Sequence, residues 1–227
     1  MSANSVLIVG EAGSGKSTSA RTLPPAETFY FNVTGKPLPY KGWKTNYTEW
    51  TRDNPKGNLL NTADSALILQ AMDFINSKRP EIKYIIVDDN QYIAADYLMN
   101  KAKETGFAKF TDVAQMIYKI GTKAKSMRDD LFIFILNHQE ETVDADGEKT
   151  VRAKTAGKMI TNTITYEGLF SIVLFTYKKD TKEGIQYGFI TNGDPKTTAK
   201  SPMGMFEGKE IQNDLLKVAE AIKEFQS

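Results

Sequence analysis

The chain has 227 residues, and 29 Lys and Arg residues against 28 Asp and Glu residues give it a net charge of +1. Affinity for nucleic acid grows with the number of phosphates that Lys and Arg neutralise, so this balance excludes a uniformly basic protein that coats nucleic acid. The absence of cysteine excludes disulfides, thiolate metal sites and a Cys nucleophile, and the single histidine excludes a His-rich metal centre. The length suits one α/β domain spanning residues 1–227.

No apolar run approaches the roughly 18 residues that a membrane-spanning helix needs. Residues 1–5 also lack the positively charged start of a signal peptide. We therefore expect a cytoplasmic protein without membrane contact.

Four short apolar runs, each stopped by glycine or by polar residues, predict strands that are buried on both faces of a parallel sheet. They lie at residues 5–9, 28–32, 84–87 and 131–136. Helices are expected between or after them at residues 16–23, 63–77, 92–104 and 110–128. Thr62 or Asn61 is the expected N-cap of the second helix, and a long loop reaches from the second strand to about Leu60.

Beyond about residue 140 the pattern changes to antiparallel pairs joined by tight turns. The two predicted hairpins, with turns at Asp146-Gly147 and at residues 182–184, pair residues 140–144 with 149–154 and residues 172–177 with 185–190. A final amphipathic helix is expected over residues 213–225. These elements predict an α/β protein with a mostly parallel sheet, flanked by helices and extended by C-terminal hairpins.

The segment Gly10–Ser17, GEAGSGKS, matches the pattern G-x-x-x-x-G-K-[ST] of a phosphate-binding P-loop and lies between a predicted strand and a predicted helix. Backbone N–H groups of such a loop surround phosphates, Lys16 would reach the β and γ oxygens, and the Ser17 hydroxyl would bind Mg²⁺. The alternative is a glycine-rich turn that only joins strand to helix. The predicted nucleotide-binding residues are Gly10, Glu11, Ala12, Gly13, Ser14, Gly15, Lys16, Ser17 and Thr18.

Two adjacent acids follow the third predicted strand. Asp88 stands where a Walker B strand carries its magnesium-binding carboxylate. The alternative is a polar residue that only ends the strand and binds no metal. Asp89 stands where many P-loop ATPases place a catalytic acid, so it is the candidate base or water-positioning group. RecA-like proteins carry their catalytic Glu at the end of the strand after the P-loop helix. This chain has Asn32 there, and an amide cannot accept the proton, so hydrolysis should be slow if Asp89 does not supply the base.

His138 and Gln139 end the fourth predicted strand, where a polar side chain would face the γ-phosphate, so they are candidate sensors of that phosphate. A lone histidine is otherwise most often structural. Lys200 lies in a late loop and is the candidate cation that a neighbouring subunit would donate to the γ-phosphate, although a surface lysine usually has no such role.

Two stretches concentrate positive charge. Residues 35–60 combine lysines with aromatic residues, and residues 149–166 carry basic residues without an acid before Tyr166. Bases stack on aromatic rings and phosphates pair with cations, so both stretches are candidates for binding single-stranded DNA. The alternatives are a loop fixed by buried tryptophans and a solvated edge strand protected by charge. The candidate DNA-binding residues are Lys41, Trp43, Lys44, Trp50, Arg152 and Lys154.

The chain resembles a known family over nearly its whole length. The segments that carry the resemblance are VLIVGEAGSGKST, NVTGKPLPYKGW, YIIVDDNQY, FIFILNHQEE, GKMITNTITYEGLFSIVLFT and TTAKSPMGMF. They are similar to those of bacteriophage ATP-binding proteins with a RecA-like P-loop core, which are generally classed as AAA-type ATPases. Related phage proteins act in single-strand annealing recombination beside a single-stranded DNA-binding protein.

This resemblance implies a RecA-like sheet with parallel strand order 5-1-4-3-2, ATP and Mg²⁺ as cofactors, and a role in phage DNA recombination or replication in the host cell cytoplasm. It implies single-stranded DNA, a phage single-stranded DNA-binding protein and further copies of the chain as partners. Two other functions remain open. One is a P-loop kinase of a nucleotide or small molecule, and the other is a nucleotide-dependent scaffold that does not hydrolyse ATP.

Overall fold

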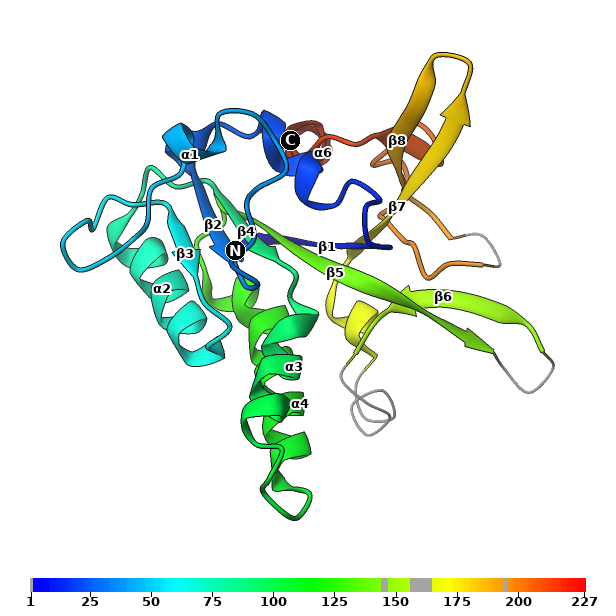
Figure 1. Cartoon of the computed structure of the whole chain (residues 1–227). Helices are drawn as coiled ribbons and strands as arrows, with labels where there is room; N and C mark the ends of the chain where they lie inside the picture. Colours follow the sequence, from blue (N-terminus) through cyan, green and yellow to red (C-terminus); the bar gives the residue numbers. More distant parts are fainter. Residues whose placement is uncertain (1, 144–146, 156–164, 194–195) are drawn as a thin grey trace.

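The computed structural model describes residues 2–143, 147–155, 165–193 and 196–227, whose strands form one mixed sheet (Figure 1). The strand order is β3-β2-β4-β5-β1-β7-β8-β9, and β6 pairs with β5. The strands are β1 (Asn4–Gly10), β2 (Thr28–Asn32), β3 (Leu59–Asn61), β4 (Tyr84–Asp88), β5 (Phe132–Val143), β6 (Lys149–Ala153), β7 (Ile172–Thr181), β8 (Gly184–Ile190) and β9 (Glu210–Gln212).

The helices are a mixture of α-helices and short 3₁₀ turns. The α-helices are α1 (Trp43–Asn46), α2 (Ser65–Lys78), α3 (Gln91–Asn100), α4 (Ala108–Thr122) and α6 (Leu215–Gln226). The 3₁₀ turns are η1 (Ser17–Thr22), η2 (Pro25–Glu27), η3 (Lys123–Ser126) and η4 (Tyr166–Leu169).

The core of the sheet is parallel and has the RecA-like order that was predicted. β2, β4, β5, β1 and β7 pair side by side in parallel, which is the order 2-3-4-1-5 when these five strands are numbered along the chain. Short β3 adds a further parallel edge strand beside β2. Their carboxyl ends therefore meet at one edge of the sheet, where ligands bind in open α/β folds.

The antiparallel extension is also confirmed. β5 continues past the parallel sheet and pairs with β6, and β7 pairs with β8, which pairs with β9, so that both hairpins project beyond the parallel strands (Figure 1). Asp146 of the first predicted turn lies outside the described residues, whereas Gly147 has the left-handed backbone (φ 84°) that favours glycine.

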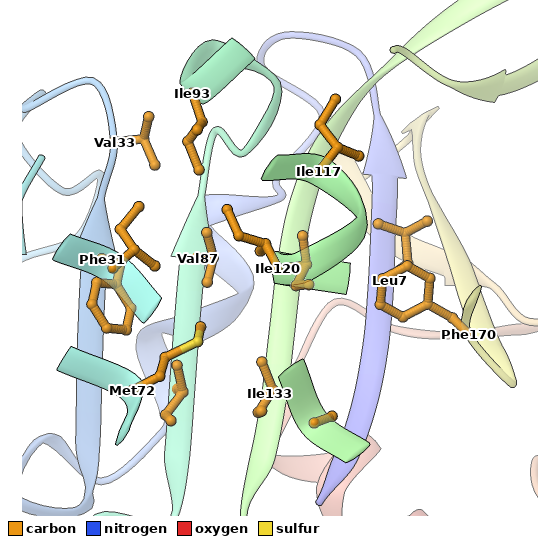
Figure 2. Packing of buried hydrophobic residues seen from close by; sticks show 14 of the residues in the cluster. Leu7, Phe31, Val33, Met72, Val87, Ile93, Ile117, Ile120, Ile133 and Phe170 are labelled. Carbon is orange, nitrogen blue, oxygen red and sulfur yellow. The ribbon is translucent and has the colours of Figure 1, made fainter. Parts of the chain in front are cut away.

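Alternating side chains of the buried strands build two hydrophobic layers. Leu7 of β1 points into the layer covered by α2, α3 and α4, and Ile8 points into the layer covered by α6 and η1. Figure 2 shows the first layer, in which Met72 and Ile120 approach Val87 and Ile133 of the sheet. Burying a side chain of this size contributes about 1.5–3 kcal/mol, so this two-sided core keeps the strand ends in fixed positions.

Three predicted details were wrong at the level of single elements. The helix expected after the P-loop is the 3₁₀ turn η1, where the Ser19 hydroxyl bonds to the Lys16 carbonyl and Pro24-Pro25 prevents continuation. The N-cap of α2 is Asp64, whose carboxylate accepts from two backbone N–H groups, and Asn61 belongs to β3. The loop expected as far as Leu60 contains α1 and the start of β3.

The largest difference concerns β5, which was expected to end at Leu136. It runs to Val143 because β6 supplies pairing partners from Gln139 onward. His138 and Gln139 therefore lie inside a strand. The register pairs Gly10 with His138, so this part of β5 still lies directly beside the start of the P-loop. Among the described residues, no helix has the length and apolar character needed to cross a membrane.

Candidate functional site

The loop after β1 has a conformation that needs glycine. Gly13 and Gly15 have left-handed backbones with φ of 72° and 92°. At Gly10 a Cβ atom would lie 1.7 Å from the Thr176 Oγ1 atom of β7. The Ser14 and Thr176 hydroxyl oxygens are 2.6 Å apart, and the Ser14 hydroxyl donates to the Glu11 carbonyl at 2.7 Å. The neighbouring strand β7 thus fixes the curvature of the loop.

Lys16 is folded back onto this loop and is only 5 % exposed. Its Nζ atom donates to the Gly10 carbonyl at 2.9 Å and to the Glu11 carbonyl at 2.7 Å. Burial lowers the pKa of Lys16, although the nearby carboxylates of Asp89 and Asp88 act in the opposite direction. Charged phosphate oxygens are stronger acceptors than these carbonyls, so an incoming polyphosphate would compete well for the ammonium group.

Asp88, at the end of β4, is buried between two hydroxyl groups. Its Oδ1 atom accepts from the Ser17 hydroxyl at 3.0 Å, and its Oδ2 atom accepts from the Tyr30 hydroxyl at 2.5 Å. Burial raises the pKa of Asp88, and these two hydrogen bonds oppose the rise. A buried carboxylate without a paired cation is costly, so this position favours binding of a positive ion.

The donor set of Ser17 and Asp88 fits Mg²⁺. Magnesium usually takes one or two protein oxygens and fills its remaining positions with phosphate oxygens and water. The Ser17 hydroxyl and the Asp88 carboxylate supply two such oxygens from neighbouring elements. Within the described part of the chain, no group of three or more His, Asp and Glu residues forms an all-protein metal cage, so the phosphates would have to complete the site.

Asp89 is held in an unusual backbone conformation at the same edge. Its φ is 61°, and among the described residues it is the one non-glycine residue with a positive φ. The His138 Nε2 atom lies 3.3 Å from Asp89 Oδ1, while the Thr34 hydroxyl and the Lys36 ammonium lie 3.1 and 3.3 Å from Oδ2. Strained backbones of this kind cluster at functional sites, because surrounding contacts must maintain them.

The surroundings of Asp89 keep its carboxylate ionised. Burial alone would raise its pKa, but the His138 hydrogen bond, the Lys36 charge and the Thr34 hydrogen bond outweigh burial and hold the pKa well below its ordinary value. A carboxylate with such a low pKa is a weak proton acceptor, although it can still orient a water molecule through hydrogen bonds. The geometry therefore suits the water-positioning role better than the role of base.

His138 and Gln139 contact the site from opposite faces of β5. The His138 ring meets the Tyr92 ring edge to face with centroids 6.0 Å apart, and its backbone N–H donates to the Gln91 side chain at 3.1 Å. Gln139 instead donates to the Glu11 carboxylate of the P-loop at 3.2 Å. Both predicted sensors thus lie close to the loop, but His138 alone of the two lines the cavity described next.

A cavity of about 330 Å³ unites most of the predicted site residues. It brings Lys16, Ser17, Asp88, Asp89 and His138 together with Ala12, Gly13, Gly15 and Thr18 of the loop. Sequence reasoning missed the contributions of Thr34, Tyr92 and Tyr30. Thr34 follows the end of a parallel strand, a position that could have identified it, whereas the role of Tyr30 depends on a hydrogen bond that no motif encodes.

Asn32 takes a structural position in place of a catalytic acid. It pairs in register with Asp88, and its amide donates to the Lys36 carbonyl at 2.8 Å and to the Asn61 side chain at 3.0 Å. These bonds fix the start of the loop that carries Thr34 and Lys36. Lys200 lies outside the cavity, with its backbone paired to Val173 of β7 and its side chain exposed.

The candidate DNA-binding residues lie in different environments. The Trp50 ring packs against Phe29 and Phe74 with centroids 6.1 and 5.5 Å away, so it helps to anchor its loop to the core. Trp43 in α1 is partly buried, and the Lys44 ammonium lies 5.8 Å from the centre of its ring. Lys41 and Lys44 are exposed.

The β5–β6 hairpin balances its own charge. Arg152 pairs with Glu140 at 3.1 Å and Lys149 pairs with Glu141 at 2.8 Å, both across the hairpin. Lys154 is exposed, and its backbone N–H donates to the His138 carbonyl at 2.7 Å. Lys158 of the same basic stretch lies outside the described residues.

Comparison with known proteins gives one family. The family model AAA domain (AAA_24) matches residues 2–203. A comparison with curated proteins gives no match. Among solved structures, the chain is similar to a KaiC-like protein from the hyperthermophilic archaeon Pyrococcus horikoshii OT3, with 11 % identity and a TM-score of 0.48 over 83 % of this chain and 78 % of that one. It is also similar to the flagellar accessory protein FlaH from Methanocaldococcus jannaschii, with 12 % identity and a TM-score of 0.48 over 92 % and 84 %.

The low pKa of Asp89 predicts a pH-dependent contribution to stability. Because the pKa in the folded protein lies below the ordinary 3.8, the contacts of Asp89 stabilise the fold fully above pH 3.8 and less as the pH falls below it. Asp89→Asn tolerates the left-handed backbone but lacks the charge. We expect the difference in unfolding free energy between wild type and Asp89→Asn to shrink by about 1 kcal/mol between about pH 5 and about pH 3 in denaturant titrations. A constant difference across that range would contradict the ionic role of Asp89.

Proposed function

The chain belongs to the AAA domain family, and from this premise we propose that it binds ATP with Mg²⁺ at the P-loop and hydrolyses the ATP slowly to ADP and phosphate. The observation that carries the proposal is the 330 Å³ cavity, which gathers Lys16, Ser17, Asp88, Asp89 and His138 at the carboxyl edge of a parallel sheet. P-loop ATPases generally bind ATP and Mg²⁺ with these residue types in this arrangement.

In this proposal each group has one task. Lys16 and the backbone N–H groups of the loop hold the phosphates, and Ser17 and Asp88 hold the magnesium ion. When bound, Mg²⁺ neutralises charge that develops on the phosphate oxygens. Asp89 orients the attacking water, and His138 senses the γ-phosphate through its contact with Asp89. The low pKa of Asp89 and the amide at Asn32 both support slow turnover.

We further propose that the nucleotide state controls binding of single-stranded DNA through the loop between β2 and β3. One end of this loop supplies Thr34 and Lys36 to the Asp89 carboxylate. Its middle carries Trp43 and the exposed Lys41 and Lys44, beside a shallow hollow of about 550 Å³. A change at the γ-phosphate that releases Lys36 would thereby reach an aromatic and basic surface of the kind that binds single strands.

From the resemblance of the sequence segments to phage ATP-binding proteins, we also propose a phage role in DNA recombination or replication beside a single-stranded DNA-binding protein, with several copies of the chain acting together. In such an assembly Lys200 of one copy would approach the γ-phosphate of the next copy. Lys200 is exposed and does not line the cavity of its own chain, and these two observations support that role.

Phosphate release separates this proposal from a kinase and from a scaffold. We expect wild-type protein with Mg²⁺ and ATP to release inorganic phosphate without transferring it to added nucleoside monophosphates. Asp89→Asn should lower kcat while the Kd of ATP changes little. Lys16→Ala should raise that Kd at least about tenfold, because a hydrogen bond to a charged group contributes about 1.5–3 kcal/mol.

Unfolding measurements on both variants serve as the control for folding. Phosphate transfer to an acceptor would instead support a kinase, and tight ATP binding without phosphate release would support a scaffold. Turnover by Asp89→Asn at the wild-type rate would remove Asp89 from the mechanism.

The DNA proposal predicts different results for the two tryptophans. Trp43→Ala should weaken binding of a fluorescent oligo-dT strand about tenfold, the size of effect that the loss of one base stack has. It should lower the melting temperature less than Trp50→Ala does, because the Trp43 ring is partly buried but, among the described residues, has no ring contact with a core phenylalanine. Trp50→Ala should lower the melting temperature, because it removes a ring packed between Phe29 and Phe74. Normal binding by a folded Trp43→Ala variant would contradict the role of this loop in DNA binding.

A further inference from the structure

The Tyr30 side chain reaches the candidate magnesium ligand Asp88 from the neighbouring strand. Tyr30 lies on β2 and pairs in register with Ile86 of β4, whereas Asp88 stands two residues further along β4 on the same face. Residues two positions apart in a strand are separated by roughly 6.5 Å, so a long side chain is needed to span this step. The tyrosine spans it, and its hydroxyl donates to Asp88 Oδ2 at 2.5 Å.

The Tyr30 hydroxyl is a fixed donor. Its residue is 0 % exposed, its backbone N–H donates to the Asn58 carbonyl at 2.8 Å, and its ring meets the Tyr47 ring edge to face with centroids 5.8 Å apart. Burial raises the pKa of Tyr30 well above its ordinary value, so the hydroxyl keeps its proton. Strand pairing and core packing therefore hold the donor at one place beside Asp88.

The two oxygens of the Asp88 carboxylate are divided between two donors. The Ser17 hydroxyl donates to Oδ1 at 3.0 Å, and the Tyr30 hydroxyl donates to Oδ2. The torsion that rotates a carboxylate has broad minima, so one hydrogen bond would leave the plane of the group poorly defined. Two bonds from different elements define that plane and keep Oδ1 beside Ser17, the other candidate magnesium ligand.

Both donors to Asp88 are neutral. A hydroxyl stabilises the ionised carboxylate through a hydrogen bond but adds no positive charge. Among the described residues no ion pair reaches Asp88, although the Lys16 charge acts on its pKa, whereas Asp89 has the Lys36 ammonium at 3.3 Å. A lysine or arginine in place of Tyr30 would compensate the carboxylate and compete with a bound cation. Tyr30 thus orients Asp88 and leaves its charge available for a metal ion.

We propose that Tyr30 is a positioning residue for magnesium, which fixes the Asp88 carboxylate so that Asp88 and Ser17 bind the ion together. This inference rests on the proposed function. Tyr30 contacts neither the ion nor the phosphates in this role, and it acts through Asp88 alone. Groups that hold a metal ligand in place commonly contribute about ten- to a hundredfold to metal affinity. Phosphate binding by Lys16 and the loop does not use this bond, so the loss expected without Tyr30 is specific to the metal.

The test measures metal binding and nucleotide binding separately in Tyr30→Phe, which keeps the buried ring and removes the hydroxyl. Mn²⁺ replaces Mg²⁺, because its electron paramagnetic resonance signal reports the bound ion directly. With protein in excess over a non-hydrolysable ATP analogue, we expect the Kd of Mn²⁺ to rise at least about tenfold relative to wild type. The Kd of ATP in EDTA, without metal, should stay nearly unchanged.

Tyr47→Phe is the matched control, because it removes the hydroxyl of the buried tyrosine that packs against Tyr30. It should bind Mn²⁺ like wild type, and the melting temperatures of both variants record the structural cost of losing a buried hydroxyl. The inference is overturned if Tyr30→Phe binds Mn²⁺ like wild type or if Tyr47→Phe loses as much Mn²⁺ affinity. It is also overturned if Tyr30→Phe weakens metal-free ATP binding as much as Mn²⁺ binding, which is the result of a merely structural role.

A measurement on wild-type protein keeps the test decisive if Tyr30→Phe does not fold. In protein labelled with ¹³C at tyrosine Cζ, the Tyr30 signal is assigned by elimination from Tyr→Phe variants of the other tyrosines. It should shift when Mg²⁺ is added to the complex with the analogue, because the ion changes the charge on the carboxylate that accepts from Tyr30, while the Tyr47 signal stays in place. A Tyr30 signal that does not move overturns the inference. Failure of wild-type protein to bind the analogue would overturn the proposed function itself, and with it this inference.

Discussion

The parallel pairing of β1 with its neighbours is the constraint on which the whole site depends. Pairing with β5 aligns Gly10 with His138, and pairing of β2 with β4 aligns Asn32 with Asp88. Pairing with β7 brings Thr176 so close to Gly10 that no side chain fits there. The two hydrophobic layers hold this register, because a slip by one residue would exchange the faces of every buried side chain. Phosphate, metal and water-positioning groups therefore meet at one edge without needing to be close in sequence.

At the carboxyl edge of the parallel strands, the charged groups of Lys16 and Asp88 are arranged so that a charged ligand would stabilise them. Lys16 donates its ammonium hydrogens to two backbone carbonyls, and the buried Asp88 carboxylate accepts, among the residues that the structure describes, hydrogen bonds from two hydroxyl groups only. Both arrangements are weaker than the pairing that phosphate and a divalent cation would provide. Asp89 differs, because the Lys36 ammonium compensates its charge and the His138 ring lies 3.3 Å from its Oδ1 atom. In this site, Lys16 and Asp88 would each gain stronger contacts from a charged ligand, whereas the Asp89 carboxylate is already held in a fixed position by its neighbours.

Sequence patterns were most informative where one short segment carries the whole signal. The P-loop and Asp88 follow from apolar runs and the residues that end them, whereas the order of the five parallel strands was implied by the family resemblance. The pairing of residues 140–144 with residues 149–154 was predicted, but the polar residues 137–139 concealed that one continuous strand, β5, runs from the parallel sheet into this hairpin. The role of Tyr30 was also missed, because it depends on a hydrogen bond to Asp88, which lies 58 positions further along the chain. The interpretation of residues 149–166 as a stretch of unbalanced positive charge overlooked Glu140 and Glu141, which β5 places opposite Arg152 and Lys149 in the hairpin.

A crystal structure with Mg²⁺ and a non-hydrolysable ATP analogue tests the central claim most directly, because it shows where Lys16 goes when phosphate is present. The account predicts that the Nζ atom leaves the Gly10 and Glu11 carbonyls for phosphate oxygens, while Ser17 and Asp88 bind the metal directly or through water. A structure in which Lys16 keeps both carbonyl bonds and the analogue lies outside the loop would contradict it.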